Sequence, residues 1–219
     1  MHRHPCLCKH WFGLLVGCLV MPVMFGCSTN QTGTYAETVL PARVVRVSGD
    51  ARLSMDNGKS WIVIRKADML GPRSLIETAY SSELEIEIGP RRSAQHLLLC
   101  RTTKVWIDLI SQQSSPAEGS LWHVNLELRT GTVMASVGDS SANSRYQVRL
   151  TNGIVTFGKG LYSVGAHGQV CVVHGKALVT LANGARTEEV LPGRAFFSDS
   201  GETVGMENYG IYNRPLLLE

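Results

Sequence analysis

Two short motifs in this sequence combine residue types that can hold a metal ion or act as a nucleophile. Cys171-Val-Val-His174 places a thiol and an imidazole three positions apart. On a strand these two residues point to opposite faces and cannot bind one ion without a bulge, so we expect no metal site. Gly138-Asp139-Ser140 lacks the later Asp-x-x-His that would complete a triad, which favours a loop. We therefore predict no catalytic residue, no metal and no cofactor.

Two rows of polar residues could form a ligand-binding face. The first row alternates with aliphatic residues and places carboxylates about 7 Å apart along one strand. It could contact a cationic partner, although cross-strand arginine or lysine would also balance a solvated acidic face. The second row mixes donors and acceptors, which suits a polar ligand or an ordinary exposed strand. The two rows are Glu83, Glu85 and Glu87, and His123, Asn125 and Glu127.

Most of the sequence after residue 42 has the two-residue period of half-buried strands. In 121–128 every second residue is apolar, which places Trp122, Val124, Leu126 and Leu128 on the inner face. The segment 146–151 repeats the pattern with Tyr146, Val148 and Leu150 inward. No long window has apolar residues at helical spacing, and residues 66–80 leave room for one helical turn. We predict an all-β domain.

A weak internal repeat joins a strand, a glycine and a second strand. The clearest copies surround Gly131 and Gly175, with apolar residues two positions apart on both sides. Gly49 and Gly193 repeat the second half of this unit. Recurring glycine corners suit stacked, coiled strands. The predicted fold is therefore all-β, either a β-solenoid-like or a curled sandwich of many short strands with Gly corners.

The first 26 residues have the composition of a lipoprotein signal peptide. A basic start precedes the apolar run 11–25, which is shorter than the roughly 20 residues needed to span a bilayer. Cys27 follows this run and begins a polar segment, so we predict that Cys27 is lipidated. The sequence 15–18, which ends at Cys18, also fits the cleavage pattern and leaves Cys18 as the alternative lipidation site. An ordinary cleaved signal peptide and an uncleaved anchor are further alternatives.

The predicted organisation has four parts. They are a signal peptide (1–26), a lipidated N-terminus with a flexible linker (27–42), a β domain (43–200) and a C-terminal extension (201–219). Removing 1–26 takes away Arg3 and Lys9 and no acidic residue, so the formal net charge falls from +3 to +1. A near-neutral domain has no electrostatic footprint for nucleic acid. The body keeps two cysteines, Cys100 and Cys171, which either pair in an oxidising compartment or stay as buried thiols.

The order of several short motifs resembles a known family. These motifs are Gly49-Asp50-Ala51, 56–61, 76–78, 81–89, 126–133, 146–153, 162–164 and 168–175. Over about residues 43–182 their order resembles the FecR domain family of extracytoplasmic β modules. The resemblance implies a β-solenoid-like periplasmic fold and protein contacts across the envelope, and it implies no catalytic residues.

Two departures limit what the resemblance implies. The family commonly has Arg-Gly-Thr where this sequence has Gly158-Lys159-Gly160. Its best-understood members carry a cytoplasmic anti-sigma segment and a transmembrane helix ahead of the domain, and neither is evident here. The iron-signalling role of the family is therefore not carried over.

The sequence leads to one functional expectation and two alternatives. We expect a non-enzymatic lipoprotein of the cell envelope, lipid-anchored at the outer membrane and facing the periplasm, that binds another envelope protein as a signalling or scaffolding module. A glycan or small-ligand binder is the alternative, and it would expose Trp106 and Trp122 on one surface beside His123 and Asn125. A glycosidase is a third candidate, because two carboxylates can come from distant strands.

Overall fold

The computed structural model describes residues 37–89, 94–115, 119–138, 143–182, 184 and 186–209. These residues belong to one compact unit, Tyr35–Glu219. The predicted signal peptide, both candidate lipidation sites Cys18 and Cys27, and the loop residues Asp139 and Ser140 lie outside the described residues. No helix within the described ranges is long and apolar enough to cross a membrane.

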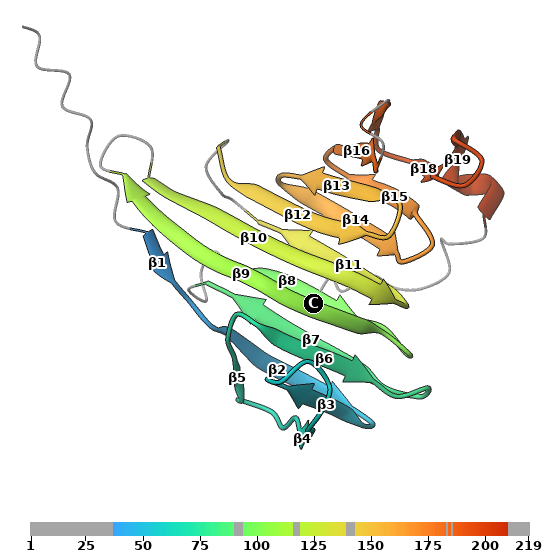
Figure 1. Ribbon diagram of the computed structural model, residues 1–219. Coiled ribbons are helices and arrows are strands. Elements are labelled where there is room, and N and C mark those ends of the chain that lie inside the picture. The colour runs from blue at the N-terminus through green and yellow to red at the C-terminus, as the bar shows by residue number, and fades with distance from the viewer. Residues whose placement is uncertain are drawn as a thin grey trace, which may run out of the picture. The chain divides into compact units, whose positions relative to one another are not determined.

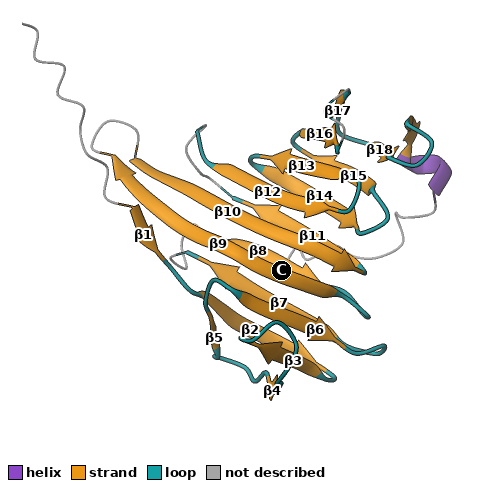
Figure 2. Cartoon of the chain, in the orientation of Figure 1, coloured by secondary structure: helices purple, strands orange, loops and turns teal. Residues whose placement is uncertain are grey.

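The unit consists of two sheets, and strands account for most of the chain drawn in Figure 1 and Figure 2. Sheet A runs in the order β17 (Thr187–Val190), β16 (Ala177–Leu181), β13 (Gly153–Phe157), β12 (Arg145–Leu150), β10 (Gly119–Thr130), β9 (Lys104–Ser115), β6 (Ser74–Thr78), β3 (Ala51–Ser54) and β4 (Ile62–Val63), and β1 (Glu37–Val39) also pairs with β9. Sheet B runs in the order β19 (Glu202–Gly205), β18 (Arg194–Phe197), β15 (Gln169–His174), β14 (Gly160–Gly165), β11 (Thr132–Val137), β8 (Gln95–Leu99), β7 (Glu83–Ile88), β2 (Ala42–Ser48) and β5 (Met69–Leu70). Among the described ladders, only the one between β10 and β12 is parallel.

The all-β prediction is confirmed, and of its two variants the structure is the curled sandwich, because its ladders are antiparallel apart from that one pair. The helical turn allowed for in 66–80 is absent. That segment instead forms turns, β5 and β6, since Ser74–Thr78 pairs with β3 on one side and with β9 on the other. The described helical structure is limited to the 3₁₀ helix η2 (Met206–Tyr209).

One hydrophobic core fills the space between the two sheets. The alternation in β10 and β12 is confirmed, because Trp122, Val124, Leu126, Leu128, Tyr146, Val148 and Leu150 are all buried in that core. Sheet B contributes Leu84, Ile86 and Ile88 of β7 to the same cluster. The side chains between these inward residues therefore project from the two opposite outer faces of the sandwich.

The glycine repeat is confirmed as a series of corners between the sheets. Gly49, Gly131, Gly175 and Gly193 each stand where the chain leaves one sheet and enters the other. All four have a positive φ, between +74° and +86°. Residues with a Cβ rarely adopt this conformation, which explains why glycine recurs at these corners.

Strands extend beyond both boundaries drawn for the β domain. Within the segment assigned to the linker, β1 covers Glu37–Val39, and within the segment assigned to the C-terminal extension, β19 covers Glu202–Gly205. Both strands are short and lack a clear two-residue pattern of apolar side chains. The two strands join the sheets because β1 pairs with β9 and β19 pairs with β18.

Candidate functional site

The structure places the two predicted polar rows on opposite sides of the molecule. Glu83, Glu85 and Glu87 lie on β7 of sheet B, whereas His123, Asn125 and Glu127 lie on β10 of sheet A. Because the intervening residues of both strands enter the same core, the two rows project from opposite outer faces. Each row stays together as a group of three, but the six residues do not form one surface.

The acidic row is balanced by cations from the neighbouring strands. Arg43 forms an ion pair and hydrogen bond with Glu87, which is only 5% exposed. Arg46 lies 3.2 Å from Glu85 and 3.9 Å from Glu83. His96 Nδ1 lies 3.3 Å from the second carboxylate oxygen of Glu85. The carboxylates of this row are thus already paired with side chains from neighbouring strands of the same sheet, as expected for cross-strand pairs.

The second row is also tied to its neighbours in sheet A. His123 Nδ1 lies 4.0 Å from Glu37 of β1, and Glu127 accepts a hydrogen bond of 2.8 Å from Arg129 Nε. Asn125 stands opposite Gln147 in the parallel ladder with β12. The outer face of sheet A is therefore polar at this row, and the side chains of the row interact with polar residues close to them.

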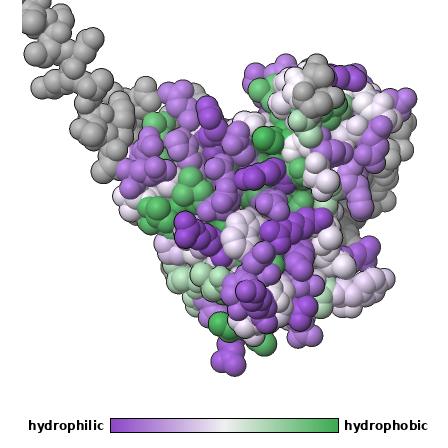
Figure 3. Space-filling model, viewed as in Figure 1, coloured by the Kyte–Doolittle hydropathy of each residue, from purple (hydrophilic) through white to green (hydrophobic). Residues whose placement is uncertain are grey.

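Four of the nine exposed large apolar side chains among the described residues lie instead at one end of the sandwich. Here sheet A ends in β4 and sheet B ends in β5, each two residues long. Four large apolar side chains on these strands and the loop before them are 54–65% exposed. We call this surface the tip, and it consists of Met55, Ile62, Val63 and Met69. Figure 3 shows hydrophobic atoms reaching the surface at this end of the molecule.

The loop that presents the tip is held by one carboxylate. Asp56 Oδ1 accepts hydrogen bonds from the backbone N–H groups of Lys59 (3.0 Å) and Ser60 (2.9 Å) and from Ser54 Oγ (2.7 Å). Asp56 Oδ2 accepts a further bond of 2.6 Å from Ser60 Oγ. Ser54 Oγ in turn accepts the backbone N–H of Gly58 at 2.7 Å. These bonds fix the path of 54–60 and so the position of the residues that follow.

The same bonds predict a pH dependence. Hydrogen bonds from Ser60, and then from Ser54 and Lys59, hold the pKa of Asp56 well below its ordinary value. A carboxyl whose pKa is lower in the folded state stabilises that state above its unfolded pKa of about 4, and this contribution is lost as the pH falls. We expect Asp56→Asn to be less stable than the wild type at pH 7, with the difference shrinking at pH 3. Urea unfolding at both pH values measures it, and an equal difference at both would contradict the prediction.

A tryptophan beside the tip is covered by two cations. The Arg52 guanidinium lies 4.4 Å from the centroid of the Trp61 ring, and Lys104 Nζ lies 5.6 Å from it. Glu77 links the two cations, with distances of 3.1 Å to Arg52 and 3.9 Å to Lys104. This cluster fixes the indole and leaves none of the four side chains isolated. It was missed in the sequence because its members come from four separate segments.

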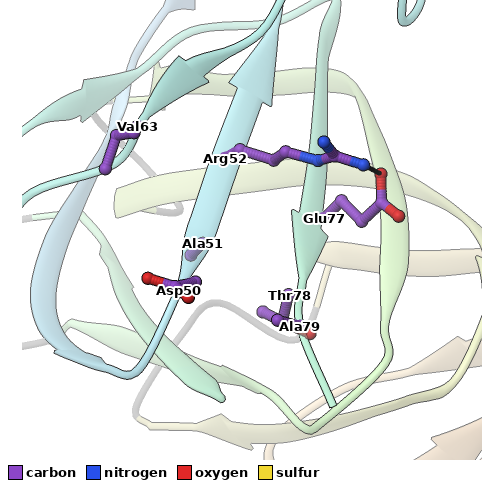
Figure 4. Close-up of a pocket in the computed structure, with 7 residues that line it drawn as sticks. All are labelled: Asp50, Ala51, Arg52, Val63, Glu77, Thr78 and Ala79. Carbon is purple, nitrogen blue, oxygen red and sulfur yellow. Dashed lines mark hydrogen bonds and ion pairs between the residues drawn. The ribbon is translucent and has the colours of Figure 1, made fainter. Parts of the chain in front are cut away.

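A small pocket opens between this cluster and the tip (Figure 4). Its volume is about 300 Å³, and Figure 4 shows Arg52 and Glu77 reaching toward one another above it, with Val63 on the neighbouring strand. It is lined by Asp50, Ala51, Arg52, Val63, Glu77, Thr78 and Ala79. This volume is at the lower limit for small-molecule sites and is suited to one side chain of a partner.

The two tryptophans that a glycan-binding surface would share lie in different environments. Trp122 is 3% exposed in the core, whereas Trp106 lies half-buried in sheet A with Arg129 5.7 Å from its ring centroid. They therefore share no exposed surface. No disulfide joins Cys100 to Cys171, and burial raises the pKa of Cys171. The described residues contain no group of three or more His, Cys, Asp or Glu side chains placed to hold a metal ion.

No family model matches the chain. No curated protein matches it either. A solved structure, described as a "putative anti-sigma factor" from Parabacteroides distasonis ATCC 8503, is similar to it with a TM-score of 0.44 and 15% sequence identity. The similarity covers 59% of this chain, and it spans 57% of that protein. The resemblance to FecR domains stays a prediction.

Proposed function

We propose that this protein is a non-enzymatic binding module of the cell envelope and that the tip is its docking surface for another envelope protein. The observation that carries the proposal is that four large apolar side chains on the last strands of both sheets and the loop before them are exposed, namely Met55, Ile62, Val63 and Met69. Single exposed apolar residues are ordinary, but clustered ones mark surfaces that another molecule covers. Lipidation at Cys27 would hold this surface near the membrane and raise its effective concentration for neighbours there.

The residues beside the tip have the character of interface hot spots. Tryptophan and arginine are enriched among residues that contribute most to protein binding. Trp61 and Arg52 are held in contact before any partner arrives, so little side-chain freedom is lost on binding. The adjacent pocket offers room for one inserted side chain. Together these features favour a protein partner.

Docking at the tip would use side chains more than backbone. The edge strand β4 has two residues, and the next N–H groups are already engaged. Ile64 N–H donates to Ala51 O (2.9 Å), and Arg65 N–H donates to the Asp68 carboxylate (2.7 Å). This leaves little free backbone for a partner strand to pair with, as is common at protected sheet edges.

The two alternatives receive less support. A glycan binder needs a free aromatic face for sugar stacking, whereas the Trp61 and Trp106 rings are covered by cations and Trp122 is in the core. A glycosidase needs two carboxylates on either side of one bond. Glu127 and the acidic row of β7 lie on opposite faces of the sandwich, so they cannot meet at one substrate.

Crosslinking in cells tests the proposal. A photo-crosslinking amino acid at Met55 of the full-length protein is expected to capture one envelope protein. Adding Ile62→Asp and Val63→Asp should lower the yield at least 10-fold, because charge at the tip opposes burial. The matched control is Ile154→Asp, which changes a 40% exposed residue on the outer face of sheet A and should leave the yield unchanged. Capture of glycan alone, or equal yields from all variants, would overturn the proposal.

A further inference from the structure

A second pocket lies at the end of sheet A opposite the tip, where β13, β16 and β17 are the last strands. Its volume is about 520 Å³, which is within the range of small-molecule sites and larger than the pocket beside the tip. We call it the distal pocket, and its lining includes Phe157, Gly158, Lys159, Lys176, Leu178 and Leu191.

Two leucines of the distal pocket are exposed to solvent. Leu178 of β16 points away from the core, because its neighbours Ala177 and Val179 are buried in the core, and it is 41% exposed. Leu191, which follows β17, is 51% exposed. Phe157, a member of the core cluster, also lines the pocket. An apolar group placed here would cover surface that now contacts water, which favours its binding.

Two lysines give the distal pocket a positive charge. Lys159 and Lys176 line it, and none of the described residues that line it is acidic. Lys176 Nζ lies 2.9 Å from Glu189 of β17, but these two side chains are 70% and 45% exposed, so water screens the pair. An anionic group at the rim of the pocket therefore has net positive surroundings.

A buried tyrosine holds the two lysine-bearing turns together. The Tyr162 hydroxyl donates a hydrogen bond to the Lys159 carbonyl oxygen (2.9 Å) and accepts one from the Lys176 N–H (3.3 Å). Tyr162 is 1% exposed, so these bonds are made away from water. The backbones of the two lysines are thus fixed relative to each other before any ligand arrives, which lowers the loss of freedom on binding.

The distal pocket is kept open by a glycine that the backbone does not require. Gly158 lies outside the left-handed region of φ, unlike the corner glycines. Apart from its chain neighbours, no described residue has an atom within 4 Å of the position that a Cβ would take. Neither conformation nor crowding therefore explains glycine here, whereas a side chain at this position would occupy space that the pocket offers.

We propose that the distal pocket binds a small organic anion in which an apolar body carries one carboxylate. The apolar body covers Leu178 and Leu191, and the carboxylate lies beside Lys159 and Lys176. The pocket and the tip are at opposite ends of sheet A, so this ligand does not compete with a protein docked at the tip.

Titration calorimetry with octanoate, octanol and octylamine tests the charge of the ligand, since the three probes share one alkyl chain. The protein is the full chain with Cys18→Ser and Cys27→Ser, so that no acyl group is attached. Octanoate is expected to bind about 5-fold more tightly than octanol, and octylamine more weakly than octanol. Equal affinities for the three probes, or no binding of octanoate at millimolar concentration, would overturn the proposal.

Lysine variants test where this preference comes from. Lys159→Gln combined with Lys176→Gln should reduce the affinity for octanoate to that for octanol and leave the affinity for octanol unchanged. The matched control is Lys59→Gln combined with Lys66→Gln, which makes the same change of charge in the loops that flank β4 and should alter neither affinity. A preference for octanoate that survives the loss of Lys159 and Lys176 would contradict the assignment.

A tryptophan at Gly158 tests the location. Gly158→Trp is expected to weaken octanoate binding at least 10-fold, because the indole fills the pocket while its open surroundings spare the fold. The matched control is Gly71→Trp, at a glycine where a Cβ would likewise have open space, and it should leave binding unchanged. Urea unfolding shows whether both variants fold, and the lysine variants decide the question if Gly158→Trp does not. Wild-type affinity in folded Gly158→Trp would place the octanoate elsewhere and reject the proposal.

Discussion

Gly131→Ala is expected to lower the free energy of unfolding by about 2–5 kcal/mol, from strain at positive φ plus overpacking. Gly131 has φ +79°, and a Cβ there would lie 2.5 Å from Thr103 Cα and 2.7 Å from Thr102 O. These are backbone atoms of the adjoining corner and cannot rotate away. Thr103 Oγ1 also bonds to Thr132 N and Thr132 O at 3.0 Å, which holds the two corners together.

The control for this substitution is another corner of the same chain. Gly193 has φ +74°, but no atom lies within 4 Å of the position that a Cβ would take. Gly193→Ala should therefore carry the conformational cost alone, about 1–2 kcal/mol. Urea unfolding followed by circular dichroism gives both values. Equal losses for the two variants would show that crowding at Gly131 is not the cause.

Trp122→Ala is expected to cost about 3–5 kcal/mol, because it removes a large buried side chain and leaves a cavity. Trp122 is 3% exposed and covers Gly89, where a Cβ would lie 3.0 Å from the indole. Little room exists for the surroundings to collapse, since β10 is paired with β9 on one side and β12 on the other.

Trp106→Ala is the matched control on the neighbouring strand. Trp106 is half-buried on the outer face, where its ring contacts the Arg129 guanidinium. Its loss should cost about 1 kcal/mol, mainly from that cation–aromatic contact. Thermal and urea unfolding of the two variants give the comparison. A larger loss for Trp106→Ala than for Trp122→Ala would contradict the burial described above.

Local patterns explain which parts of the fold were readable from the sequence. The alternation that places Trp122 and Val124 inward repeats every two residues, and the glycine corners recur for a backbone reason that needs no tertiary information. Both depend on neighbours along the chain. The same periodicity assigns residues to one face of a strand but not to a sheet. For that reason it could not show that Glu83 and Glu127 lie on opposite sides.

The candidate site depends on how the sheets end, and that is not a local property. Ile62 and Val63 are β-forming apolar residues that a pattern alone would place inward. They are exposed because β4 is the last strand of sheet A and has no strand beyond it in the described structure. The Trp61 cluster likewise needs Arg52, Glu77 and Lys104 to come together from three strands in register.

Because the glycine corners recur and the two sheets stay open, the number of strands in each sheet can change without altering the rest of the fold. Each strand–glycine–strand unit adds a layer to both sheets, and within the described residues both sheets end in short strands rather than closing on each other. Gain or loss of a unit at the β17 and β19 end would leave the earlier layers packed as before, as in repeat proteins whose units contact only their neighbours. In evolution, such chains can change size by duplication or deletion at one end while the opposite end, with its tip, keeps its shape.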